Sequence, residues 1–77
     1  MEVNLVANTI AIKQRMRNEK LTVQQVSTAL SMDQSTFHRK LSKNGTTFTL
    51  EQAEILACML KLTPQEAQSI FFDRELA

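Results

Sequence analysis

The sequence predicts a small all-α domain, a bundle of five helices joined by short connections. The chain has 77 residues, which is enough for one compact domain. It contains one glycine and one proline, so there is little material for hairpin turns. Apolar residues recur at helical spacing, and each run follows a residue that commonly begins a helix.

The first helix is expected from about Val3 or Ala7 to Glu19. Ile12 and Met16 are four residues apart and would share its buried face. For residues 1–8 three interpretations stay open: an extension of this helix, a separate arm, or part of a dimer contact.

Two short helices follow, at about 22–31 and 33–43. Thr22 is a typical N-cap, and Gln25 stands at the capping-box position three residues later. Asp33 is the expected N-cap of the third helix, where its carboxylate would accept backbone N–H groups. Phe37 and Leu41 would form the buried pair of this helix, and Asn44-Gly45 would end it.

The last two helices have the same kind of start. Thr49 and Gln52 predict a capping box for the fourth helix, after a loop from which Phe48 would plug the core. The fifth begins with Thr63-Pro64, where proline suits the first helical position, and Glu66 completes its box.

Charge is distributed unevenly along the chain. The formal net charge is +1, but residues 13–43 carry seven basic and two acidic residues, and residues 44–77 carry two basic and five acidic ones. Such asymmetry can make one basic face on a nearly neutral molecule. Ordinary solvated helix surfaces would give the same pattern, so charge alone decides nothing.

The turn at Ser31-Met32 is the most informative feature. Two helices joined by so few residues must cross steeply, as in a helix-turn-helix, whose second helix can enter a DNA major groove. Opposite Phe37 and Leu41, the third helix carries hydrogen-bonding side chains rather than a Glu/Lys mixture. The candidates for base contacts are Gln34, Ser35, Thr36, His38 and Arg39. The candidates for phosphate contacts near the end of this helix are Lys40, Ser42, Lys43 and Asn44.

A family resemblance runs through roughly residues 10–72. Its core is the pattern Ile12-x3-Met16-x4-Leu21-Thr22-x3-Val26-x3-Leu30-Ser31-Met32-x2-Ser35-Thr36-Phe37-x3-Leu41, followed by Leu56-Ala57-x2-Leu60-x-Leu62-Thr63-x2-Glu66 and Ile70-Phe71-Phe72. The chain thus resembles the phage repressor/Cro-like (XRE-type) helix-turn-helix regulators, in particular short phage and prophage regulators of Gram-positive bacteria. The resemblance implies a lambda-repressor-like fold and base contacts from the third helix. It also implies phosphate contacts from Thr22 and Gln24 at the start of the second helix and from Lys43 and Asn44 at the end of the third.

Three residues depart from that family's pattern. Val23 stands where the family usually has a phosphate-binding Gln, so that contact would be lost or pass to Gln24. Ser27 replaces a small Ala, and its hydroxyl needs a partner. Ser31 replaces the turn Gly and would have to adopt the turn's backbone geometry at some strain.

Nothing in the sequence indicates an enzyme, a metal site or a cofactor. His38 is the only histidine and Cys58 the only cysteine, expected as a half-buried helix residue. A single cysteine, with no apparent leader or membrane span, fits a cytoplasmic protein. One of Phe71 and Phe72 would complete the core, and the other would either face a partner subunit or be exposed at a frayed end.

The sequence therefore predicts a DNA-binding transcriptional regulator, a repressor in preference to an activator. Its expected partner is double-stranded operator DNA, bound as a homodimer that could form only on DNA. Two alternatives stay open: a protein-interaction module of the same fold, such as an antirepressor that binds a regulatory protein, and an excisionase-like DNA-architectural factor.

Overall fold

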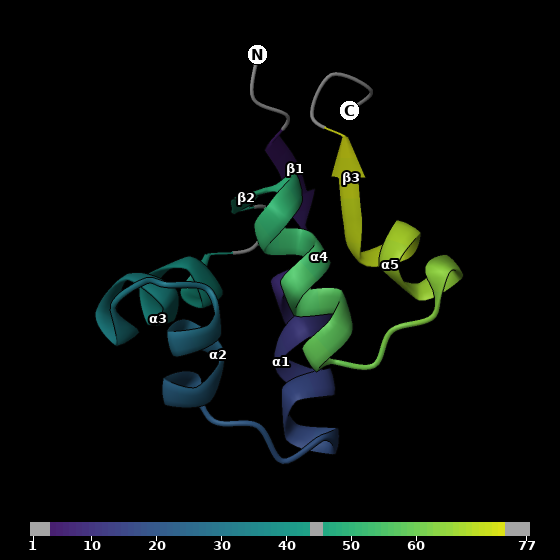
Figure 1. Ribbon diagram of the computed structural model, residues 1–77. Coiled ribbons are helices and arrows are strands. Elements are labelled where there is room, and N and C mark those ends of the chain that lie inside the picture. The colour runs from purple at the N-terminus through teal and green to yellow at the C-terminus, as the bar shows by residue number, and fades with distance from the viewer. Residues whose placement is uncertain (1–3, 44–45, 74–77) are drawn as a thin grey trace.

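The computed structural model describes residues 4–43 and 46–73, in which five helices pack beside a three-stranded sheet (Figure 1). In chain order the elements are β1 (Asn4–Ala7), α1 (Thr9–Asn18), α2 (Val23–Ala29), α3 (Gln34–Ser42), β2 (Thr47–Thr49), α4 (Leu50–Met59), α5 (Pro64–Ile70) and β3 (Phe71–Asp73). The predicted helical majority is therefore confirmed, whereas the expectation of an all-α fold has to be corrected for the sheet. None of these helices is long and apolar enough to cross a membrane.

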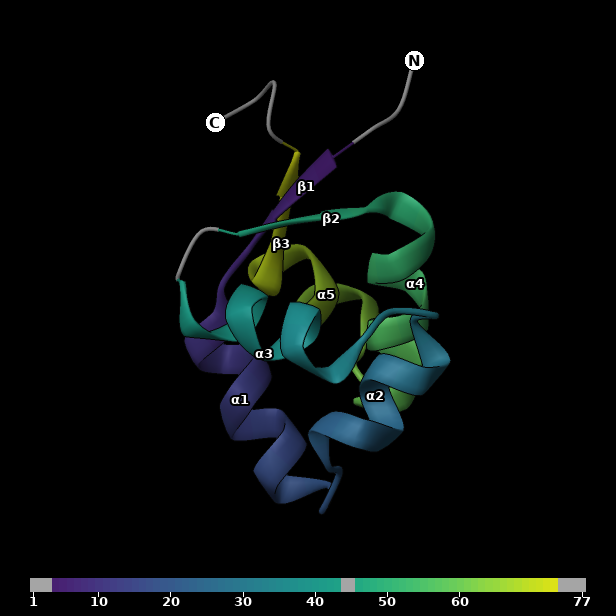
Figure 2. The ribbon, with the colours of Figure 1, turned by 90° about the vertical axis from the view of Figure 1, so that its left-hand side faces the viewer.

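The sheet is antiparallel, with β1 between β2 and β3. Leu5 pairs with Phe48 on one side, and Val6 pairs with Phe72 on the other. Figures 1 and 2 both show the sheet at the opposite end of the molecule from the α1–α2 connection. The sheet thus joins the start of the chain, its middle and the end of α5.

The first helix is shorter at its start than predicted. Asn8 is its N-cap, because the Asn8 side chain accepts a hydrogen bond from the backbone N–H of Ala11 at 3.2 Å. Residues 4–7 form a strand instead of extending the helix or making a separate arm. The physical reason is the pairing with two distant segments, which satisfies the backbone groups of these residues outside a helix.

Phe48 fills the core, as predicted, but from strand β2 instead of a loop. Its side chain is 1% exposed. The centroid of its ring lies 6.4 Å from that of Phe37 and 6.4 Å from that of Phe71. On another side, the Lys40 ammonium lies 5.2 Å from the ring centroid and donates a hydrogen bond to the Thr47 carbonyl at 2.9 Å. Helix α3 and the sheet therefore meet at one aromatic side chain.

The three predicted Thr capping boxes are confirmed. The hydroxyls of Thr22, Thr49 and Thr63 each accept a backbone N–H, and the side chain three residues later returns the contact. Asp33 does occupy the N-cap position of α3, but its side chain makes no capping hydrogen bond. The prediction that the Asp33 carboxylate accepts backbone N–H groups of α3 is therefore wrong, and the residue is exposed to solvent.

Three helices end in the same left-handed turn. Lys20, Ser31 and Lys61 have φ angles of 56°, 56° and 54°. In each case the amide of the next residue bonds back to a carbonyl in the last helical turn, for example Met32 to Ser27 at 3.0 Å. The strained geometry predicted for Ser31 is thus present, and it sets the direction in which α3 leaves α2.

Arg15 ties α1 to the connection between α4 and α5. Its Nε and Nη2 atoms donate to the carbonyls of Leu60 and Lys61, both at 3.0 Å. Its Nη1 lies 2.7 Å from a carboxylate oxygen of Glu66. Hydrogen bonds from the Thr63 backbone and from Arg15 hold the pKa of Glu66 below its ordinary value of 4.5.

This lowered pKa predicts an acid-sensitive contribution to stability. Because the folded state favours the charged carboxylate, the contribution is present above pH 4.5 and is lost as the pH falls through the lower folded-state pKa. Glu66→Gln removes the charge but keeps the capping-box chemistry that Gln25 and Gln52 provide elsewhere. Urea denaturation should find the variant less stable than the wild type at neutral pH and equally stable at low pH. A constant difference across the titration would contradict the prediction.

Candidate nucleic-acid interface

Helices α2 and α3 form the pair on which the candidate site is built. Residues 30–33 connect them, and the core side of the pair is anchored by Val26 and Phe37, both 0% exposed. Figure 2 shows α2 and α3 together on one side of the molecule, in front of the other helices. The buried Ser27 hydroxyl donates to the Gln24 carbonyl at 3.2 Å, which supplies the partner that this position requires.

The outer side of α3 carries four of the five side chains predicted to contact bases. Gln34, Ser35, His38 and Arg39 are exposed, whereas Thr36 is half-buried. The four exposed residues line one shallow depression of about 530 Å³, together with Val23 and Ser42. All of these polar side chains can donate hydrogen bonds, and none is acidic. The structure therefore brings the predicted base-contact residues together, except for Thr36.

The residues predicted to contact phosphates do not form one group. Thr22, Gln24 and Lys43 are exposed at the start of α2 and the end of α3, while Asn44 lies outside the described residues. The Ser42 hydroxyl donates to the Arg39 carbonyl at 2.7 Å.

Lys40, which the sequence predicted to contact a phosphate, has a structural role in the fold. Its side chain is half-buried, and its ammonium group is held by the Thr47 carbonyl and the Phe48 ring. The sequence could not show this contact, because Thr47 lies seven residues further along the chain and in a strand that was not predicted.

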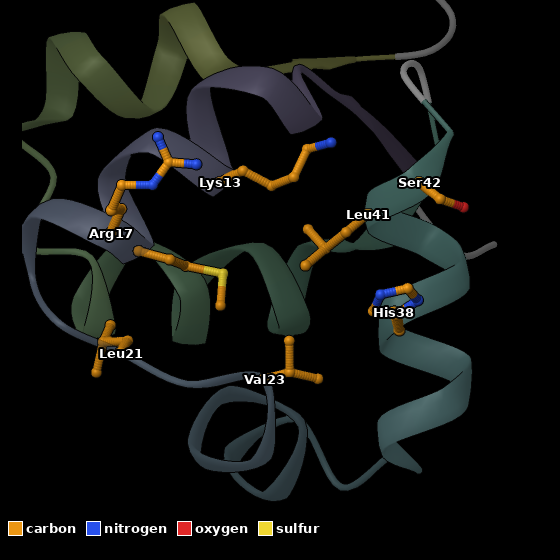
Figure 3. Close-up of a pocket in the computed structure, with 8 residues that line it drawn as sticks. Lys13, Arg17, Leu21, Val23, His38, Leu41 and Ser42 are labelled. Carbon is orange, nitrogen blue, oxygen red and sulfur yellow. The ribbon is translucent and has the colours of Figure 1, made fainter.

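A groove between α1 and α3 adds two basic residues that the sequence interpretation did not assign to the site. It has a volume of about 520 Å³, and its rim carries Lys13 and Arg17 from α1 and His38 and Ser42 from α3 (Figure 3). Its apolar lining consists of Met16, Leu21, Val23 and Leu41. A signal for the α1 residues was present in the sequence. Two like charges four residues apart on one helix repel each other, and an anionic partner relieves that repulsion.

Val23 lies where the groove and the depression on α3 meet. It is half-buried, packs against the core and lines both surfaces. The position where the resembling family usually has a Gln is thus filled by an apolar side chain. Gln24, the neighbour that was predicted to take over this contact, is exposed.

Phe71 is the one of the two C-terminal aromatics that completes the core, a role predicted for one of the pair, so only its assignment as a partner-face candidate has to be corrected. Phe71 is 8% exposed and packs edge-on against Phe48, so it completes the core and offers no surface to a partner. The side chain of Phe72 lies outside the described part of the structure. Cys58 is exposed instead of half-buried. Among the described residues, no group of His, Cys, Asp or Glu side chains is placed to hold a metal ion.

Two connected surfaces therefore make up the candidate site: the exposed side of α3 and the groove beside it. Both are lined by polar or basic side chains, the groove above an apolar floor and the depression with Val23 as its one apolar residue among those described. They share Val23, His38 and Ser42. Comparisons with protein-family models, curated proteins and solved structures found no match to the chain.

Proposed function

We propose that this protein is a sequence-specific DNA-binding transcriptional regulator that uses α2 and α3 as a helix-turn-helix. The observation that carries the proposal is the exposed side of α3, where Gln34, Ser35, His38 and Arg39 line one surface without an acidic residue. A helix that only has to stay in solution gains nothing from excluding carboxylates. A helix that faces phosphates and the acceptor-rich edges of bases binds better without carboxylates, because they would repel the phosphates.

Each side chain has a role that follows from its chemistry. Arg39 can donate two hydrogen bonds to O6 and N7 of guanine, and Gln34 can pair with N6 and N7 of adenine. Ser35 and His38 are placed between them on the same surface and can bond to base edges or to phosphates. Lys43 at the end of α3 and the Thr22–Gln24 segment at the start of α2 would contact the two flanking backbones, which sets register without reading sequence.

The regulatory role is part of the same proposal. The described residues hold five short helices and three strands, which is enough for one DNA-reading unit, so regulation would follow from occupancy of an operator. Occupancy by two copies on half-sites about one DNA turn apart would make the protein a homodimer on DNA. Because Phe71 is buried, the contact between the two copies would have to use other residues.

The decisive experiment compares Arg39→Ala with Lys43→Ala. Sites are selected from random duplex DNA with the wild-type protein, and binding is then measured for selected and scrambled sites at several salt concentrations. Arg39→Ala should cost about 1–3 kcal/mol on the selected site and should relax the preference at one base pair. Lys43→Ala should weaken binding to all sequences similarly and lower the salt slope by about 1.

Lys61→Ala is the control, because Lys61 is exposed in the α4–α5 connection, which contributes no residue to the candidate site. It should leave the base preference unchanged. Absence of salt-sensitive binding by the wild-type protein would overturn the proposal and would favour the protein-interaction module. Binding that is salt-sensitive but has no base preference that Arg39→Ala alters would favour the architectural factor.

A further inference from the structure

We infer that the groove between α1 and α3 is a second DNA contact, in which Lys13 and Arg17 bind phosphates of one DNA strand. The inference rests on the proposed function and extends it to a helix outside the α2–α3 pair. It begins from the groove's rim, where two basic side chains of α1 stand across from His38 and Ser42 of α3 (Figure 3).

The two α1 cations, Lys13 and Arg17, form no ion pair with the described part of the chain. In the described part of the chain, the ion pairs join Arg15 or Lys61 to Glu19 or Glu66. Neither Lys13 nor Arg17 takes part in any of them, and both side chains are exposed. None of the described residues that line the groove is acidic. Their charges are therefore available to an anion from outside.

The three cations of α1 alternate between two surroundings: Arg15 contacts the rest of the fold, and Lys13 and Arg17 line the groove. Arg15 stands between Lys13 and Arg17 in the sequence but points toward the α4–α5 connection. Its guanidinium donates hydrogen bonds to the carbonyls of Leu60 and Lys61 and to the Glu66 carboxylate. Residues 13 and 17 are one helical turn apart and so lie on one side of α1, which faces the groove. The helix thus directs one cation into the fold and two toward α3.

The shape and lining of the groove favour a phosphodiester strand over a small ligand with an apolar body. Of the four apolar residues that line it, Met16 and Leu41 are only 6% and 5% exposed and Leu21 and Val23 are half-buried, so the apolar surface left for a ligand to bury is small. The groove also continues into the depression on α3, because Val23, His38 and Ser42 line both. A DNA strand that borders the major groove occupied by α3 would follow this continuous surface.

The contact would add affinity and orientation without adding base preference. An Arg guanidinium can bind a phosphate through two parallel hydrogen bonds, and a Lys ammonium acts as a point charge. Each phosphate neutralised contributes about 0.9 to the slope of log affinity against log salt. Two such contacts contribute about 1.8, which corresponds to an additional loss of about tenfold in affinity for a fourfold increase in salt.

The test uses the double variant Lys13→Gln/Arg17→Gln in the full chain. Its matched control is Lys20→Gln/Lys61→Gln, which removes the same net charge from exposed residues that do not line the groove. The salt slope and the base preference are measured for both variants and for the wild type, and thermal unfolding checks that each variant is folded. The groove variant should lose about 1.8 from the slope and keep the base preference, while the control should keep both.

Two results would overturn the inference. Equal slopes for the groove variant and the control would remove the α1 contact, whereas the proposed function would stand if Arg39→Ala still altered base preference. A wild-type protein without salt-sensitive DNA binding would remove both. If the two salt slopes are equal, a further measurement identifies a small-ligand site. Such a site would replace the DNA contact if dodecyl phosphate raised the melting temperature of the wild type but not that of the groove variant.

Discussion

Phe48→Ala is expected to lower the free energy of unfolding by about 3–5 kcal/mol, the cost of truncating a buried phenylalanine. The side chain is 1% exposed and touches rings from α3 and β3. The substitution also removes the ring that the Lys40 ammonium contacts at 5.2 Å. A small domain has a total stability of about 5–15 kcal/mol, so the variant should lose a large fraction of its stability and unfold at a clearly lower temperature.

Urea denaturation followed by far-UV circular dichroism measures this effect. The control is Leu50→Ala, a truncation two residues further on of a side chain that is 49% exposed, which should change stability by about 0.5 kcal/mol or less. If the two variants were equally stable, β2 would not hold the core together in the way that its contacts indicate.

The helices could be predicted because their signals are local. The Thr22, Thr49 and Thr63 boxes each need only two residues three positions apart, and all three are present in the structure. The sheet could not be predicted in the same way. β1 forms only because β2 and β3, which are distant in the sequence, lie on either side of it. A strand of three or four residues has no periodicity long enough to distinguish it from the start of a helix.

In the candidate site, too, some features follow from local sequence and others depend on tertiary contacts. The exposed side of α3 follows from the positions of Phe37 and Leu41, since residues on the opposite side of a helix must face outward. Which lysines are free depends instead on tertiary contacts. Lys40 is held by Thr47 and Phe48, whereas Lys13 faces the groove, and neither fact is encoded near those residues.

The second large effect is expected for Arg15→Gln. Shortening this side chain removes two hydrogen bonds of 3.0 Å to the carbonyls of Leu60 and Lys61 and one of 2.7 Å to Glu66. An exposed ion pair alone contributes at most about 1 kcal/mol. The two bonds from a charged donor to carbonyls raise the expected loss to about 2–3 kcal/mol, because water replaces them only in part at this half-buried position.

Arg17→Gln is the matched control, since it makes the same chemical change two residues away on α1. Arg17 is exposed and in no ion pair of the described residues, so the substitution should leave the unfolding free energy within about 0.5 kcal/mol of the wild type. Under conditions where both variants are folded, the order should reverse for DNA: Arg17→Gln lowers the salt slope by about 0.9 and Arg15→Gln leaves it unchanged. Residues two apart on a helix point about 200° from each other, so one helix can direct alternate cations inward and outward. If both substitutions lowered stability equally, Arg17 would also belong to the fold, and the α1–α3 groove would lose one of its two free charges.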